Sequence, residues 1–419
     1  MFAGDSDSKK STFCNIFHNI TKKHIKLHIF LLIFAFLFLL NNIDSKNVYA
    51  ENDDVVDVEI ELNNATSNIL DNMDFSELEN YLQNSQFNYS FLNNKTFKEF
   101  VVDVVNGEEE FGIKEFFIFL INSFKSLSIQ LLSPLLSVFI IILLATLFNN
   151  LRGRKISGVS EIIYLVCFAG VVLILSYVIS GIVINVKDSI SNVQNQMNIL
   201  FPILITLMTG IGGVATASAY SPLMAMLSFL ISKIFFYILF PLFSLSLILS
   251  IVGNISENVR LTKFNGFLKS SFKWILGIVC SVFLAYLSVK SVVQAGKDGL
   301  SIKATKYAIK NYIPMLGGYI SDGFQFVKAG GLIVKNAVGF VGIILIVGTC
   351  IIPVLSVGVM QLGLKFLSGV VEPLGDDKSA KFFLSISDSL KMLLAIIIGI
   401  AIMYFFTLYL MISSLSGVL

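Results

Sequence analysis

The sequence predicts an all-α polytopic membrane protein, with about seven transmembrane helices that follow a signal peptide and a small acidic exported segment. Hydrophobic residues make up 55% of its 419 residues and charged residues only 14%, whereas soluble domains carry about 25% charged residues. Several apolar runs are long enough to cross the roughly 30 Å hydrocarbon core of a bilayer. We expect four regions: a signal peptide at 1–50, an acidic exported segment at 51–110, an interfacial amphipathic helix at 111–130 and a polytopic membrane domain at 131–419.

Residues 1–50 have the pattern of a secretory signal. Lysines precede an apolar run from Ile29 to Leu40, and Val48 and Ala50 suit a signal-peptidase site. The run is too short to cross a bilayer as a helix, although an uncleaved anchor is the alternative. Cleavage after Ala50 would remove every histidine of the chain (His18, His24 and His28). The mature chain would then lack imidazole for acid–base catalysis or zinc ligation.

The exported segment is strongly acidic, with about fifteen carboxylates against Lys95 and Lys98. Val55–Leu62 alternates apolar and acidic residues, which is typical of a strand. We interpret it as an extended acidic tail or as a strand donated to a partner's sheet. The spacing of Phe75, Leu78 and Leu82 predicts a short helix, and Thr96 with Glu99 predicts a capping box that opens another.

Apolar residues at helical spacing predict the interfacial helix at 111–130. Spans are expected at 131–148, 162–184, twice within 197–252, and at 274–293, 338–360 and 393–415. With an exported N-terminus, the positive-inside rule places Arg152, Arg154 and Lys155 in the cytoplasm. Seven spans then place 294–336 and the C-terminus inside and 253–273 outside. If 197–252 instead crosses the membrane an odd number of times, 253–273 lies inside and 294–336 lies outside.

The motifs of common enzyme classes are missing from the sequence. There is no GxxxxGK[ST] motif for nucleotide binding and no soluble basic domain for nucleic acid. Cys167, Cys280 and Cys350 stand singly in apolar runs, where cysteine acts as a small hydrophobe. We therefore predict no catalytic, cofactor or metal site, and an energy source in another protein or in a gradient.

Glycine and proline interrupt the run from Leu200 to Leu227. The candidate broken-helix or packing site consists of Gly210, Gly212, Gly213, Pro222 and Lys233. Small residues allow helix backbones to approach closely, and broken helices can line a transport path. Lys233 must snorkel, pair or face water if it lies in hydrocarbon.

Farther along, Lys303, Lys306 and Lys310 suggest a surface helix. A candidate turn follows it, formed by Pro314, Gly317, Gly318 and Asp322. A continuous helix from Ser321 to Met360 would then carry one narrow stripe of lysine and glycine. The stripe is the candidate assembly or pore face, and its members are Lys328, Gly331, Lys335, Gly339 and Gly342. It is either a groove for another helix or a face toward a pore or vestibule.

Two stretches, "LFPILITLMTGIGGVATASAYSPL" and "YIPMLGGYISDGFQFVKAGGLIVKNAVGFVGI", resemble the stage III sporulation protein AE family of endospore-forming Firmicutes. The resemblance runs from about Met197 to Gly342. It implies a subunit of the mother-cell membrane that faces the forespore, within a channel-like complex of AA-to-AH proteins that supports late forespore gene expression. It also implies a separate ATPase subunit and, indirectly, forespore protein Q as partners.

We therefore expect a non-enzymatic platform or pore component in contact with membrane lipid, without nucleic acid and with possible homo-oligomers. The alternative is a stand-alone secondary transporter or permease, for which no second copy of the interrupted-helix segment is found. An integral membrane enzyme is disfavoured by the missing histidine.

Overall fold

The computed structural model describes residues 54–84, 95–107, 113–150, 157–255, 261–312 and 317–415. The chain divides into two compact units, Met1–Val58 and Glu59–Leu419. The signal peptide expected at 1–50 lies outside the described residues and stays a prediction. Of the first unit only the opening residues of a helix are described, so the fold below is that of the second unit.

The acidic segment contains three short helices: α2 (Asp54–Asn72), α3 (Ser76–Asn84) and α4 (Phe97–Asn106). Phe75 and Leu78 are buried, as the predicted helical spacing requires. The predicted capping box is confirmed, because the Thr96 hydroxyl accepts from the Glu99 backbone N–H and the Glu99 carboxylate accepts from the Thr96 N–H. Gly107 ends α4 in a left-handed conformation, with φ +69°.

The strand interpretation of Val55–Leu62 is wrong, because these residues form the start of α2. A lone strand leaves its backbone N–H and C=O groups without partners, whereas a helix pairs them within itself. Beyond Leu62, the buried residues Thr66 and Leu70 follow at steps of four and set a helical face. The apolar–acidic alternation covers only eight residues, and the segment is helical throughout. It is therefore neither an extended tail nor a donated strand.

Six long rods of helix form the rest of the unit: α5 (Ile113–Asn150); α6 (Ser157–Gly210); α7 (Val214–Phe229), continued by the π-helix η2 (Leu230–Leu239) and α8 (Phe240–Ile255); α9 (Thr262–Tyr312); α10 (Gly317–Val371); and α11 (Asp377–Ser413). Each rod contains a stretch long and apolar enough to cross a membrane, which gives six candidates among the described residues. The chain is therefore a polytopic helical membrane protein, as the composition predicted.

The sequence predicted two spans within 197–252, but the structure shows a different division of this run. Residues 197–210 continue α6 and residues 214–253 form the next rod, so six candidate spans are found where seven were expected. The predicted interfacial helix at 111–130 and the span after it are one helix, α5, while the helix predicted from Ser321 to Met360 is confirmed within α10. A helix satisfies its own backbone in water and in lipid, so a change in hydropathy does not mark its end.

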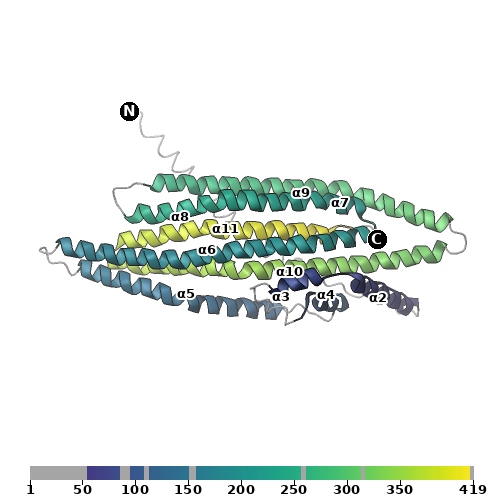
Figure 1. Ribbon diagram of the computed structural model, residues 1–419, viewed down its shortest axis with the longest axis horizontal. Coiled ribbons are helices and arrows are strands. Elements are labelled where there is room, and N and C mark those ends of the chain that lie inside the picture. The colour runs from purple at the N-terminus through teal and green to yellow at the C-terminus, as the bar shows by residue number, and fades with distance from the viewer. Residues whose placement is uncertain are drawn as a thin grey trace, which may run out of the picture. The chain divides into compact units, whose positions relative to one another are not determined.

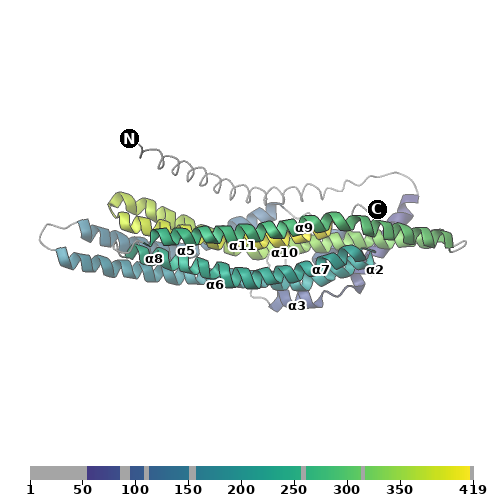
Figure 2. The ribbon, with the colours of Figure 1, turned by 90° about the horizontal axis from the view of Figure 1, so that it is seen from above.

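Helices α10 and α11 form the centre of the bundle. They run side by side in Figures 1 and 2, and α10 also packs against α5, α6 and α9, while α11 packs against α8 and α9. Most of their side chains are buried, including Val338, Val341, Leu390, Ile396 and Leu408. The outer helices α5, α6, α8 and α9 instead expose large apolar side chains on their outward faces.

Candidate functional site: the two ends of the bundle

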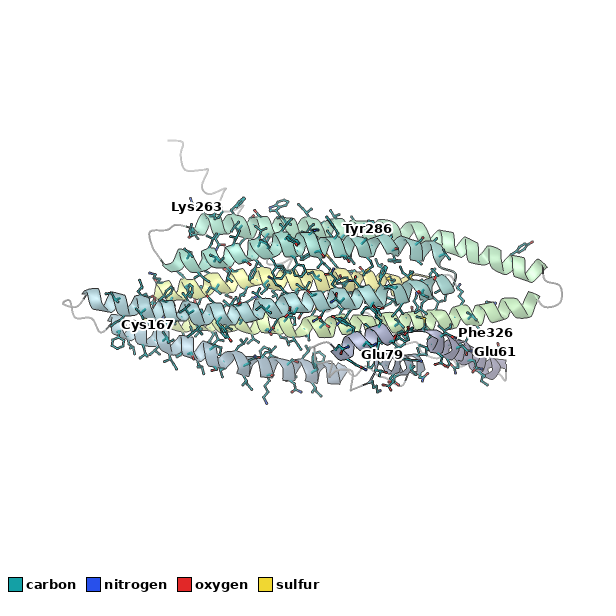
Figure 3. The ribbon with its side chains drawn as sticks, viewed as in Figure 1. Glu61, Glu79, Cys167, Lys263, Tyr286 and Phe326 are labelled. Carbon is teal, nitrogen blue, oxygen red and sulfur yellow. The ribbon has the colours of Figure 1, made fainter. Side chains whose placement is uncertain are left out.

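The bundle has two ends with different chemistry. At the hairpin end, α5, α8 and α10 finish and α6, α9 and α11 begin; at the capped end, α6 turns into α7 and α11 finishes (Figure 1). Figure 3 shows Lys263 and Cys167 toward the hairpin end and Phe326, with Glu61 of the acidic segment, toward the capped end. The predicted site residues concentrate at the capped end.

Lys335 caps the last turn of α11. Its side chain is 0% exposed, and its ammonium donates to the backbone carbonyls of Ile412 at 2.8 Å and Ser414 at 2.5 Å. The last carbonyls of a helix have no partner within the helix and carry its negative dipole end, so a cation there supplies both hydrogen bonds and charge. Lys335 is thus part of the internal structure of this chain.

The glycines of the stripe face other helices of the same chain. A Cβ on Gly331 would collide with Ile211, which follows α6, and one on Gly339 would collide with Ile412 of α11. One on Gly342 would collide with Leu200 of α6. Lys328 is also buried. At these three glycines the stripe is therefore in contact with Ile211, Ile412 and Leu200 of the same chain. Its role as an assembly or pore face stays a prediction.

The glycines after α6 form a turn instead of an interruption within one span. Gly212 has φ +89°, and the Gly213 N–H donates to the Met208 carbonyl at 2.8 Å before α7 begins. A Cβ on Gly213 would collide with Leu415. The turn and the Lys335 cap therefore meet at the capped end, although no sequence pattern joins the two sets of residues.

The other members of the broken-helix set lie elsewhere. Gly210 is the last residue of α6 and Pro222 lies within α7, and both are exposed. Lys233 is in η2, exposed, with its ammonium 5.3 Å from the centre of the Tyr237 ring. This cation–π contact joins Lys233 to a ring one turn along the same helix.

The candidate turn is only partly described. Pro314 lies outside the described residues, whereas Gly317 and Gly318 are the first residues of α10 and Asp322 lies one turn farther into it. In the structure the glycine pair begins a helix, so any change of direction lies before it.

Asp376 organises the hairpin end, and sequence reasoning missed it. Its carboxylate accepts from Tyr164 of α6 at 2.9 Å, from the Ser379 hydroxyl at 2.7 Å and from the Ser379 N–H at 3.0 Å, while Thr146 of α5 lies at 3.4 Å. Asp376 is buried and is the N-cap of α11. The signal that could have found it is the stretch "GDDKS", in which Asp376 precedes Ser379 at capping distance after a glycine.

Two more buried polar networks join the helices. In the first network the Ser246 hydroxyl donates a hydrogen bond to the Asn265 amide oxygen at 2.6 Å, and the Asn265 amide nitrogen donates to the Ser250 hydroxyl at 2.8 Å. The Ser250 and Ser389 hydroxyls are hydrogen-bonded at 2.8 Å. This network links α8, α9 and α11. Gln196 of α6 donates to Thr349 of α10 at 3.0 Å. Polar pairs of this kind stabilise helix association in membranes.

Several polar side chains of the core thus bond to one another across helix contacts. In the described part of the chain there is no cluster of three His, Cys, Asp or Glu side chains that could hold a metal ion. The class defined by this architecture is a multi-pass helical membrane protein with internal polar ties.

Comparison with known proteins agrees with this class and narrows it. Residues 95–414 match the family described as Stage III sporulation protein AE, and the chain belongs to that family. Stage III sporulation protein AE of Bacillus subtilis (strain 168) is 25% identical over 319 residues, which cover 75% of this chain and 79% of that protein. No solved structure matches the chain.

Proposed function

We propose that the chain is a non-enzymatic integral membrane subunit of the mother-cell to forespore channel, a secretion-like complex needed for sporulation and late forespore gene expression. Family membership carries this proposal, because residues 95–414 match the family over nearly all of the membrane bundle. The partners that follow are the other stage III sporulation A-complex proteins, with a separate ATPase subunit, and indirectly forespore protein Q.

Within this function, the platform role has more support than the pore role. The centre of one bundle is occupied by α10 and α11, whose contact face includes Gly339 against Ile412 and Gly342 against Leu408. A conduit through the middle of a single copy would have to separate these two helices. We therefore propose that this chain holds other subunits, and that any conduit lies between chains.

The transporter alternative loses its main support. It rested on an interrupted helix and on Lys233, but the glycines turn the chain between α6 and α7, and Lys233 lies exposed over Tyr237. A substrate path built on a broken helix needs the break inside the bundle, near the middle of the membrane.

We propose that the hairpin end faces the cytoplasm of the mother cell. Exposed lysines gather there, on α9, α10 and α11: Lys263, Lys273, Lys365, Lys381 and Lys391. Short basic segments beside spans favour the cytoplasm. Six crossings would then place the exported segment and the end of α11 together on the far side, toward the forespore.

The test is purification of the tagged chain from sporulating cells after crosslinking in the intact cell. We expect the other subunits of the complex, including the ATPase, to be recovered with it. A chain recovered without them, and able to move a solute when reconstituted alone into vesicles, would instead establish the transporter.

A further inference from the structure

We infer that one face of α6 lines an aqueous passage at the same membrane depth at which the α5 and α9 sides of the bundle meet lipid. This polar face consists of Asn185, Asp188, Ser191, Asn195, Asn198 and Thr206. The inference deepens the proposed function and rests on it in one respect, because other chains must close the passage on its far side.

The polar face is continuous and long enough to cross a membrane. Its members follow one another at steps of three or four, with Pro202 between the last two, so they share one side of the helix. All are exposed, and no large apolar side chain is exposed on α6 from Asn185 to Thr206. These residues cover about 32 Å, against about 30 Å of hydrocarbon.

Helix α7 widens the polar face. It packs against α6 and runs back from the glycine turn, so the two helices are antiparallel. Thr206 lies four residues before the last residue of α6, and Ser218 lies four residues after the first residue of α7. Ser218 and Ser221 are exposed as well. The polar surface therefore extends over two neighbouring helices.

The depth of the polar face is fixed by contacts with α10. The Gln196 amide of α6 donates to Thr349 of α10 at 3.0 Å. Helix α5 runs parallel to α10, and its Leu135 faces Gly363. Fourteen residues earlier on each helix, Ile121 lies at the level of Thr349. Ile121 is 63% exposed, so α5 presents an apolar surface at the depth of Gln196.

Contacts through α11 bring α9 to the same level. Gly342 of α10 faces Leu408 of the antiparallel helix α11. Thr349 comes seven residues after Gly342 and Gly399 comes nine residues before Leu408, so these two lie within two residues of one level. Gly399 faces Leu276 of α9. Leu276 is therefore at the depth of Thr349 too.

The α9 side is a lipid surface at this depth. The candidate span in the described part of α9 is Thr262–Leu287, and it exposes Trp274, Ile278 and Val282. Lys273 is the one exposed charge from residue 264 to residue 287, and its long side chain can extend toward the headgroups. At one depth, the bundle thus has apolar sides at α5 and α9 and a polar side at α6.

A polar side at this depth needs water. Amides and a carboxylate are costly to place in hydrocarbon, and such groups within spans face a bundle interior or a water-filled cavity. The polar face of α6 is on the outside of one copy, where it is exposed. The water it faces must therefore lie between this chain and its neighbours.

The acidic segment supports this placement independently. The Tyr81 hydroxyl of α3 donates to the Asn192 side chain, beside the polar face, at 2.7 Å. Figure 2 shows α3, α6 and α7 along the same side of the bundle. Helix α3 also carries Glu77 and Glu79, whose carboxylates exclude hydrocarbon from that side.

The chemistry of the polar face indicates which solutes suit the passage. Its groups are amides and hydroxyls, which donate and accept hydrogen bonds without charge. The carboxylate of Asp188 is next to Lys187, whose ammonium lies 5.3 Å from the centre of the Phe240 ring. The lining therefore has little net charge and suits small hydrophilic solutes of either sign.

The test compares cysteines at one depth on different sides of the bundle, in opened membranes from sporulating cells. With the native cysteines replaced, Asn195→Cys should react with a membrane-impermeant maleimide. Ile121→Cys and Ile278→Cys should not, because the thiolate is the reactive form and does not arise in hydrocarbon. Ser218→Cys and Ser281→Cys are a second pair, in which sulfur replaces one oxygen, so the fold is little disturbed. We expect labelling of the first alone.

Protection of both Asn195→Cys and Ser218→Cys would overturn the inference, and so would equal labelling of Ile278→Cys. The passage itself is tested by Asn195→Leu with Asn198→Leu, which should lower a late forespore reporter while the chain is still recovered with its partners. Ile278→Leu is the control, and an unchanged reporter in the double variant would refute the passage.

Recovery of partners separates this inference from the proposed function. Partners recovered with a chain whose polar face is protected would refute the lining and leave the proposed function intact. A labelled polar face on a chain that recovers no partner would refute the proposed function alone, and the passage would then be closed by further copies of this chain.

Discussion

Lys335 and Ile412 are 77 residues apart in the chain, yet the ammonium of the first lies 2.8 Å from the backbone carbonyl oxygen of the second. This bond joins the middle of α10 to the end of α11, and the Ser414 carbonyl accepts a second bond from the same ammonium. The two central helices are therefore tied at the capped end by a side chain and not only by apolar packing.

Replacing Lys335 by methionine should destabilise the protein while nearly preserving side-chain volume. The change removes two charge-assisted hydrogen bonds to part-buried carbonyls, so we expect a loss of about 1–3 kcal/mol. The melting temperature in detergent measures it. Lys233→Met is the matched control, because Lys233 is exposed and bonds only to a ring. Equal melting temperatures for the two variants would mean that the cap adds nothing.

Gly339→Ala should be destabilising although alanine favours helices. The new methyl group meets Ile412 on the facing helix, and overpacking of this kind costs about 1–3 kcal/mol. In Gly277→Ala of α9 the methyl group enters open space, so that variant should be neutral or up to about 1 kcal/mol more stable. Denaturation of both variants in detergent tests the pair, and a stabilised Gly339→Ala would refute the close contact.

Asp376→Ala should loosen the hairpin end. It removes the N-cap of α11, and it leaves the part-buried hydroxyl of Tyr164 and the buried hydroxyl of Thr146 with one acceptor fewer. We expect a loss of about 1–3 kcal/mol. Asp377→Ala is the adjacent control, because Asp377 is exposed. Faster proteolysis at this end in Asp376→Ala alone would support the assignment, and identical digestion of both variants would contradict it.

With an exported N-terminal segment and six crossings, α11 should end outside the cytoplasm. A reporter active only outside the cytoplasm should be active when fused after Ser414 and inactive when fused after Gly375, which lies between α10 and α11. The two fusions differ by one helix, so each is the control for the other. Activity in the reverse order would restore the seven-span arrangement.

The helical class, the capping box at Thr96 and the long helix after Ser321 could be predicted because each rests on local spacing. The groove along Gly331, Gly339 and Gly342 was also visible as a stripe, since small residues at helical spacing indicate close packing whatever the partner. Which helix enters the groove depends on tertiary contacts with Ile211, Ile412 and Leu200, and these are far away in the chain.

The helix boundaries were harder to predict for a physical reason. Hydropathy changes at Asn185, where α6 leaves its apolar surface, but the backbone continues as a helix to Gly210. The predicted span was therefore ended where polar residues begin and not where the helix ends. Asp376 escaped notice because its partners, Tyr164 and Thr146, are more than 200 residues away.

The Lys335 cap sets an order of events during synthesis. The carbonyls that receive its ammonium are made 77 and 79 residues later, roughly 4 to 16 seconds at ordinary translation speeds. During that interval α10 already exists with a lysine that has no final acceptor. The cap can form only after Ile412 and Ser414 have been made, so any product truncated before Ile412 lacks both of its hydrogen bonds.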